Sequence, residues 1–318
     1  MARLGRVFRL SSSLPRGSGR FPVDLDISAG DLIHGKFLFR IVVAGPISLL
    51  NRRRRNLSKP TEYLMPTKLV AMVEDAKPSL HLLRLFHACY AYVDRDPLLH
   101  VGVIALSNRP ACTVLCSDLA AITGSPQAKS NAWIKSAIDG EGWRSLFSLL
   151  SLDTTGRLLT FKFAPKVGVA AQRNEEKTPF AMLDSEEIRV IRSVDEAFFY
   201  TRALMVAQAN QPLFYLPNIC PEVAPWTDNS KKSWLRIAAR VGAKLDQHYL
   251  IIPRRDPLTR RVASVRVNVT TKSSFWTAGQ FFPLPPCPPV SIVHDGNFRS
   301  LSRDELVSRK MWTRVTRP

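Results

Sequence analysis

The clearest pattern of apolar and polar positions lies between residues 106 and 167, where its period changes. Apolar residues first recur at helical spacing, and the chain is then broken at Gly124 and Pro126, which suit a helix C-cap and the first turn of a new helix. The later part has the composition of a β-hairpin around a polar turn. The predicted elements are helices over 117–122 and 127–138 and strands over 146–152 and 158–163.

Longer helical patterns flank this stretch. Apolar residues form a wide stripe along 79–93, so we expect this helix to be buried in the core. A long helix is expected from Asp184 to Ala209, with Glu186 and Glu187 in its first turn, where the helix dipole favours acidic side chains. A helix of this length can brace two domains against each other. Further predicted elements are a helix over 63–75 and a strand over 101–106 that would pair with the hairpin.

The same order of elements recurs after residue 227. A cationic helix is predicted over 231–241, closed by Gly242, and strands over 249–252 and 262–269 flank an arginine-rich turn. A helix, a tight turn, a polar-faced helix and a hairpin are the elements of a winged helix in chain order. We therefore expect an α+β chain of two winged-helix domains joined by a long helix, with a basic N-terminal arm. The expected parts are 1–60, a basic and partly disordered arm; 61–170, the first winged helix; 171–211, a linker and the bracing helix; 212–280, the second winged helix; and 281–318, a Pro-rich and basic tail.

The charge of the chain points to a polyanionic partner. Among 318 residues, 45 are Lys or Arg and 26 are Asp or Glu, which gives a formal net charge of +19. A field of this strength attracts nucleic acid first and an anionic membrane second. About half of the excess lies in residues 1–60, which hold 12 Lys and Arg against three Asp. The alternative to nucleic-acid binding is that the excess of positive charge only keeps the protein soluble.

No catalytic centre, cofactor site or metal site is expected. The five cysteines contain no Cys-x-x-Cys pair, which favours free thiols in a reducing compartment. Residues 124–130 lack the second glycine of a phosphate loop. Asp24 and Asp26, with Ser79-Leu80-His81 downstream, resemble the first two motifs of archaeo-eukaryotic primases, but no third carboxylate motif follows. No apolar run approaches the roughly 20 residues of a membrane span, so a membrane partner is not expected.

The predicted function is binding rather than chemistry. In a winged helix, the helix after the turn enters the major groove, and the hairpin lies on the backbone or in the minor groove. The alternative for each of these two helices is that its polar face is an ordinary solvent-exposed helix surface that does not contact DNA. The candidate contact residues are Gln127, Lys129, Ser130, Asn131 and Lys135 on the first helix, Arg157 on the first hairpin, Lys231, Lys232, Arg236 and Arg240 on the second helix, Arg254, Arg255, Arg260 and Arg261 on the second hairpin, and the run Arg52, Arg53, Arg54 and Arg55.

Residues 68–270 resemble the tandem winged-helix plasmid replication initiators in their order of elements and in the segments SDLAAITG and GRLLTFKFAPKV. The resemblance implies a protein that binds repeated origin sequences in double-stranded DNA, opens the duplex and recruits the host helicase. It also implies homodimers that repress their own promoter, and a cytoplasmic, nucleoid- or plasmid-associated location. The arginine-rich N-terminus and the Pro-rich tail do not belong to that pattern.

A second function is left open by residues 1–21. This segment is rich in Arg and Ser and contains no acidic residue, which is typical both of a mitochondrial transit peptide and of a basic arm. If it is a transit peptide, we expect an organellar RNA-binding or ribosome-associated structural protein of the mitochondrial matrix.

Overall fold

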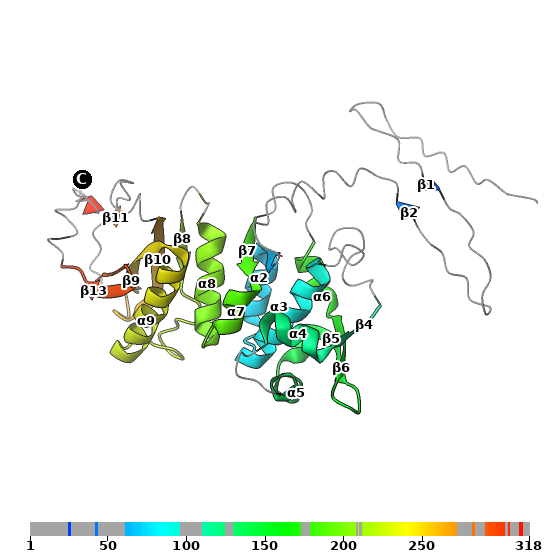
Figure 1. Cartoon of the computed structure of the whole chain (residues 1–318). Helices are drawn as coiled ribbons and strands as arrows, with labels where there is room; N and C mark the ends of the chain where they lie inside the picture. The colour runs from blue at the N-terminus through cyan, green and yellow to red at the C-terminus, as the bar shows by residue number, and fades with distance from the viewer. Residues whose placement is uncertain are drawn as a thin grey trace, which may run out of the picture. The chain divides into compact units, whose positions relative to one another are not determined.

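The computed structural model divides the chain into two units, 1–58 and 59–318, and most of the described residues belong to the second (Figure 1). The structure describes residues 25–26, 42–43, 61–95, 110–124, 130–172, 179–207, 209, 212–271, 282–283, 290–302, 305 and 312–313. In the first unit, β1 (Leu25–Asp26) pairs antiparallel with β2 (Val42–Val43). Predictions that lie outside the described residues are the strand over 101–106, Gln127, Lys129, and the run Arg52, Arg53, Arg54 and Arg55.

The larger unit is an α+β structure, and its first half is built around α3 (Leu80–Arg95). The other elements of this half are α2 (Thr67–Asp75), β4 (Cys112–Leu115), α4 (Cys116–Thr123), α5 (Ala132–Asp139), the 3₁₀ turn η2 (Trp143–Ser145), β5 (Phe147–Leu152), β6 (Leu158–Phe163) and α6 (Pro165–Ala170). The apolar stripe of α3 is buried, as predicted, and Phe86 packs edge-on against Phe147 and Phe163. Helices α4 and α5 pack on α3, and the strands form an antiparallel sheet in the order β4-β6-β5.

The predicted hairpin is confirmed, and the two short helices are found with altered bounds. Helix α5 begins at Ala132, five residues later than expected. The prediction of a helix over 63–75 is wrong in its first part, because β3 (Glu62–Pro66) pairs antiparallel with β7 (Phe180–Asp184). Pro66 has extended backbone angles, and α2 starts only after it. The ladder with β7 satisfies the backbone groups that a helix would otherwise have paired.

The prediction of one long helix from Asp184 to Ala209 is also wrong. The chain forms β7, then α7 (Ser185–Val190), then α8 (Val194–Val206). Ser193 caps α8, since its hydroxyl accepts a hydrogen bond from the backbone N–H of Glu196 at 3.1 Å. The Glu196 carboxylate in turn accepts the backbone N–H of Arg192 at 3.2 Å. These two bonds satisfy backbone groups at the break that a continuous helix would have paired.

The second half is a helix packed on a five-stranded sheet. The helix is α9 (Asp228–Leu245), and the strands are β8 (Leu213–Tyr215), β9 (Gln247–Arg255), β10 (Val262–Thr271), β12 (Ser291–His294) and β13 (Asn297–Ser300), in the order β13-β12-β9-β10-β8. Strands β12 and β13 come from the segment that was expected to be a tail. The remaining pair, β11 (Phe282–Pro283) and β14 (Trp312–Thr313), is parallel.

The sequence predicted that α9 ends at Gly242, but the helix continues to Leu245. It is closed by Asp246, which has a left-handed conformation with φ of 51°. A Cβ at position 242 would lie 2.7 Å from the carbonyl oxygen of Gln247. Gly242 is therefore required for the close approach of α9 to β9 rather than for a helix end.

Helix α8 connects the two halves. It packs against β7 of the first half and against α9 of the second (Figure 1). Its Phe199 contacts Phe214 and Tyr249 edge-on, with ring centroids 5.1 Å and 4.9 Å apart, and is buried. The bracing role expected of one long helix is thus filled by α8, together with α7, which packs on α3 and α4 and is ion-paired with α9 through Glu187. Within the described residues, no helix combines the length and the apolar character that crossing a membrane requires.

Candidate nucleic-acid interface

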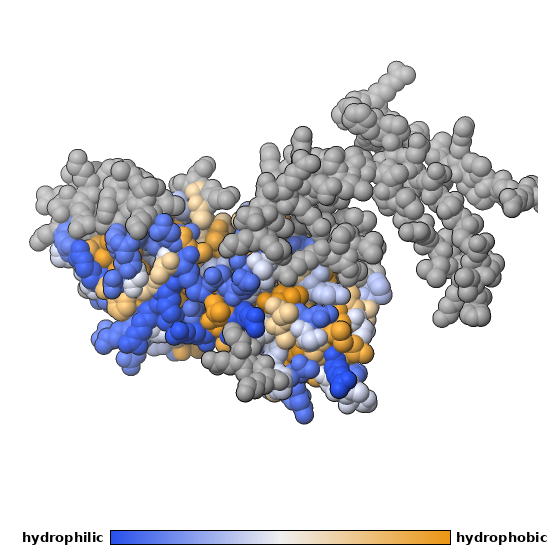
Figure 2. Space-filling model, in the orientation of Figure 1, coloured by the Kyte–Doolittle hydropathy of each residue, from blue (hydrophilic) through white to orange (hydrophobic). Residues whose placement is uncertain are grey.

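One face of α9 is polar and exposed near its N-terminus. The helix buries Trp234, Leu235, Ile237, Ala238 and Val241 against the sheet. On the outer side, Lys232 and Arg236 lie one turn apart and are exposed, with Asn229 and Ser233 beside them. Figure 2 shows hydrophilic surface gathered over this helix. These side chains offer ammonium, guanidinium, amide and hydroxyl groups on a single helix face.

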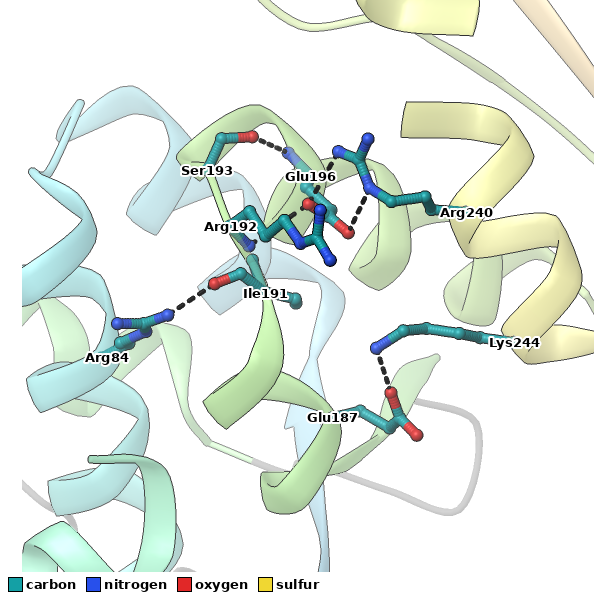
Figure 3. Close-up of polar contacts among 8 residues, drawn as sticks. All are labelled: Arg84, Glu187, Ile191, Arg192, Ser193, Glu196, Arg240 and Lys244. Atoms are coloured by element: carbon teal, nitrogen blue, oxygen red, sulfur yellow. Dashed lines mark hydrogen bonds and ion pairs between the residues drawn. The ribbon is translucent and has the colours of Figure 1, made fainter. Parts of the chain in front are cut away.

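The cations nearer the C-terminus of α9 point to the protein instead (Figure 3). Arg240 forms an ion pair with Glu196 of α8 at 2.9 Å, and the side chain of Glu196 is only 3% exposed. Lys244 forms an ion pair with Glu187 of α7. Arg240, a predicted contact residue, is therefore held in an internal contact that fixes α9 on the α7–α8 junction.

Lys231 is also engaged, because its ammonium group lies 3.3 Å from the hydroxyl of Ser300 on β13. The hairpin of β12 and β13 therefore runs beside α9. Its exposed Phe298 adds apolar surface there, while the exposed Arg299 forms an ion pair with Glu305 at 2.8 Å. The sequence prediction missed this hairpin, although Asp295-Gly296 between apolar segments is a hairpin signal.

The second hairpin carries its four arginines on the outside. Arg254, Arg255, Arg260 and Arg261 are all exposed, as the sequence predicted for this tip. The turn between them is ordered by Asp256, whose carboxylate accepts the backbone N–H groups of Leu258 at 2.7 Å and Thr259 at 2.9 Å. These backbone hydrogen bonds lower the pKa of Asp256, so it stays ionised.

The positive charge of this hairpin extends down the strands. Arg266 on β10 has a lowered pKa, first because it is partly buried and second because of the positive charge of Arg254. Arg254 pairs with Ser264, two residues from Arg266 on β10, so both arginines lie on the same face of the β9–β10 pair and an anion placed there would be attracted by both.

The first half offers fewer cations. Lys135 on α5, Ser130 before it and Arg157 in the hairpin turn are exposed. Asn131, a predicted base reader, is half-buried, and its side-chain amide donates to the carbonyl of Gly156 at 2.8 Å. This bond joins the start of α5 to the turn of the hairpin. Asn131 thus positions the helix relative to the hairpin.

The turn of the first hairpin is closed in the same way as the second. The carboxylate of Asp153 accepts the backbone N–H groups of Arg157 and Leu158, both at 2.8 Å. A hydrogen bond from the Thr155 hydroxyl is the largest cause of the lowered pKa of Asp153, and these backbone bonds add to it. Each hairpin is therefore preorganised by an ionised aspartate at the start of its turn.

Comparisons with known proteins show a weak structural resemblance. No known protein family matches the sequence, and no curated protein matches it. Among solved structures, the chain is similar to the crystal structure of the Pi initiator protein in complex with iteron DNA, with a TM-score of 0.46 and 12% identity. The alignment covers 68% of this chain and 100% of that chain. Similarity at this level assigns neither fold nor function, and we therefore infer function from the residues of this chain.

Proposed function

We propose that this protein binds double-stranded DNA through two winged-helix units. The observation that carries the proposal is a strand order common to both halves. In the first half, β4 precedes α4 and α5 and pairs with β6, the second strand of the hairpin. In the second half, β8 precedes α9 and pairs with β10, again the second strand of the hairpin. A helix followed by a hairpin, with an earlier strand on its far edge, is the topology of a winged helix.

The two winged-helix units differ in the size of their sheets and in the number of helices between the first strand and the hairpin. The first has two short helices, α4 and α5, between its first strand and its hairpin. The second has the single helix α9, which follows an irregular stretch that contains the bridge between Cys220 and Ala224. The helix that enters the major groove would be α5 in the first unit and α9 in the second.

Charge supports duplex DNA as the ligand. Lys232 and Arg236 on α9 can reach base edges or phosphates, and guanidinium forms a bidentate pair with guanine. The exposed arginines of the second hairpin can hold phosphates or enter a narrow minor groove. Arg240 and Lys244, which are ion-paired with α8 and α7, would keep α9 at a fixed angle to the first winged helix.

Within this function, we propose the narrower role of a plasmid-type replication initiator that binds repeated origin sequences. Two DNA-reading units in one chain suit the recognition of a long site, and the basic character suits fast association with DNA. In this role the protein would act as a homodimer, contact host replication proteins and reside at the nucleoid or on a plasmid. It would not be an enzyme.

The test is a binding experiment with the full chain on duplex DNA and on structured RNA over a range of salt concentrations. The proposal predicts tighter binding to duplex DNA, with an affinity that falls steeply as salt rises. Arg236→Ala should weaken binding, while Lys68→Ala, an exposed cation on α2, serves as the charge-matched control. Preference for structured RNA would support the organellar alternative instead.

A further inference from the structure

Three potential metal ligands meet where the β12–β13 hairpin lies beside the first residues of β9. His248 is the second residue of β9, while His294 and Asp295 lie at the turn of the β12–β13 hairpin. Each of the three offers one ligand atom, and these atoms lie within 4.8 Å of one another. The imidazole rings of His248 and His294 are stacked, with centroids 4.1 Å apart and planes 10° from parallel.

We propose that His248, His294 and Asp295 bind a divalent transition-metal ion such as Zn²⁺. Two imidazoles and one carboxylate form a donor set that suits zinc and its neighbours, whereas magnesium and calcium prefer oxygen ligands alone. Ligand atoms bound to one zinc ion lie roughly 2.0–2.2 Å from it. The ligand atoms are within 4.8 Å of one another, but the two imidazole planes are almost parallel, so binding of one ion requires the exposed His294 ring to turn out of the stack toward the buried His248.

The backbone holds these ligands in place. Asp295 and Gly296 both have positive φ, 48° and 72°, which makes the turn between β12 and β13 a tight one. The register pairs Val293 with Tyr249, so the residues that follow on β12 lie beside those that precede on β9. His248 is 1% exposed, whereas the side chains of His294 and Asp295 are 45% and 51% exposed. The site thus has a fixed inner ligand and an open outer side where water can complete the coordination.

A bound ion would fasten the β12–β13 hairpin to β9 near the C-terminus of α9. A Cβ at Gly296 would lie 3.8 Å from Ala243 of α9, and Ser300 at the other end of the hairpin lies near Lys231. The hairpin therefore borders α9 along its length. The metal would have a structural role, and its binding would reduce the local motion of the β12–β13 hairpin.

The experiment is a titration of chelator-treated full-length protein with Zn²⁺ by calorimetry, and with Co²⁺ by visible absorption. We expect one ion per chain at this site. The Co²⁺ spectrum should show d–d bands without the near-ultraviolet band that thiolate ligands produce. Hydrogen exchange in residues 291–300 should slow on zinc binding, a readout independent of DNA binding.

The matched variants use exposed ligands whose replacement spares the fold. Asp295→Asn removes the charge but keeps a residue that tolerates positive φ, and His294→Gln removes one imidazole. Each should weaken zinc binding at least tenfold, while His81→Gln on α3 should leave it unchanged. Binding that persists in both variants, or that is lost with Cys112→Ser instead, would overturn the assignment, as would the absence of any binding to the folded wild-type protein.

Discussion

The guanidinium group of Arg240 on α9 forms an ion pair with the carboxylate of Glu196 on α8, with a nitrogen–oxygen distance of 2.9 Å (Figure 3). The same carboxylate accepts the backbone N–H of Arg192, at the break between α7 and α8. On the other side of this break, Arg84 of α3 donates to the carbonyl of Ile191 at 2.5 Å. The junction therefore ties the first half of the structure to the helix that we propose as a DNA reader.

Two single replacements on α9, at Arg240 and at Arg236, should affect different properties: the first should lower stability and the second DNA affinity. Arg240→Met leaves the buried carboxylate of Glu196 without its cation, so the free energy of unfolding should fall by about 1–3 kcal/mol. Arg236 is exposed, and Arg236→Ala should lower DNA affinity with little change in stability. Denaturant titration and DNA-binding isotherms of both variants test this. If Arg240→Met unfolds at the same denaturant concentration as the wild type, the ion pair contributes no stability.

The arginines of the second hairpin should act through DNA phosphates. Replacing Arg254, Arg255, Arg260 and Arg261 by Ala should weaken binding to all duplex sequences alike. Because each lost phosphate contact removes counterion release, the slope of log affinity against log salt should become shallower by about 2–4 units. An equal number of exposed lysines and arginines replaced on other elements provides the charge-matched control. An unchanged slope would show that the hairpin does not contact DNA.

Asn131 and Lys135 should have different roles despite lying one turn apart. Asn131→Ala removes the hydrogen bond to Gly156, so stability should fall by about 1 kcal/mol, and the hairpin should lose its fixed position relative to α5. Lys135→Ala, at an exposed position, should leave stability unchanged and alter DNA affinity or sequence preference. Unfolding curves and binding to a panel of duplexes distinguish the two. If Lys135→Ala lost stability and Asn131→Ala did not, Lys135 rather than Asn131 would have the structural role.

The stability of the first half should depend on pH through His87. This residue is buried, burial lowers its pKa to about 3, and its Nδ1 lies 2.7 Å from the hydroxyl of Tyr63. Below the ordinary pKa of 6.5 the unfolded chain takes up a proton that the folded protein refuses. His87 should therefore reduce the free energy of unfolding by about 1.4 kcal/mol per pH unit between pH 6.5 and pH 3.

The check is denaturant unfolding at several pH values in wild type and in His87→Gln. The variant should be less stable at pH 7, because a packed ring is lost, but its stability should fall less steeply as the pH drops. Parallel curves for the two proteins would show that His87 does not control the acid sensitivity.

Local patterns in the sequence were sufficient to predict the first hairpin, the burial of α3 and the exposed arginines of the second hairpin. The first hairpin could be predicted because Asp153 and Gly156 specify its turn and apolar residues mark its strands. The burial of α3 followed from its wide apolar stripe. The exposed arginines of the second hairpin followed from the cost of burying unpaired charge.

The break between α7 and α8 was missed because apolar residues keep their helical spacing across it. Ile188 and Ile191 lie before the break, and Ala197 after it, and all three are buried. The available signal was Ser193-Val194-Asp195-Glu196, which matches a helix-capping sequence.

Contacts between distant segments could not be predicted at all. Helical spacing places Arg240 on an outer face of α9, but only the packing of α8 brings Glu196 to it. His248 and His294 are likewise brought together by the pairing of β9 with β12, which no motif in the sequence marks.

Selection of bound sequences from a random duplex DNA library, using the full chain, is the most direct test of two DNA-reading units in one protein. The account predicts an enriched site with two conserved segments, of which one loses its preference in Arg236→Ala and the other in Lys135→Ala. A library that remains random after selection, or a single segment affected by neither substitution, would contradict it.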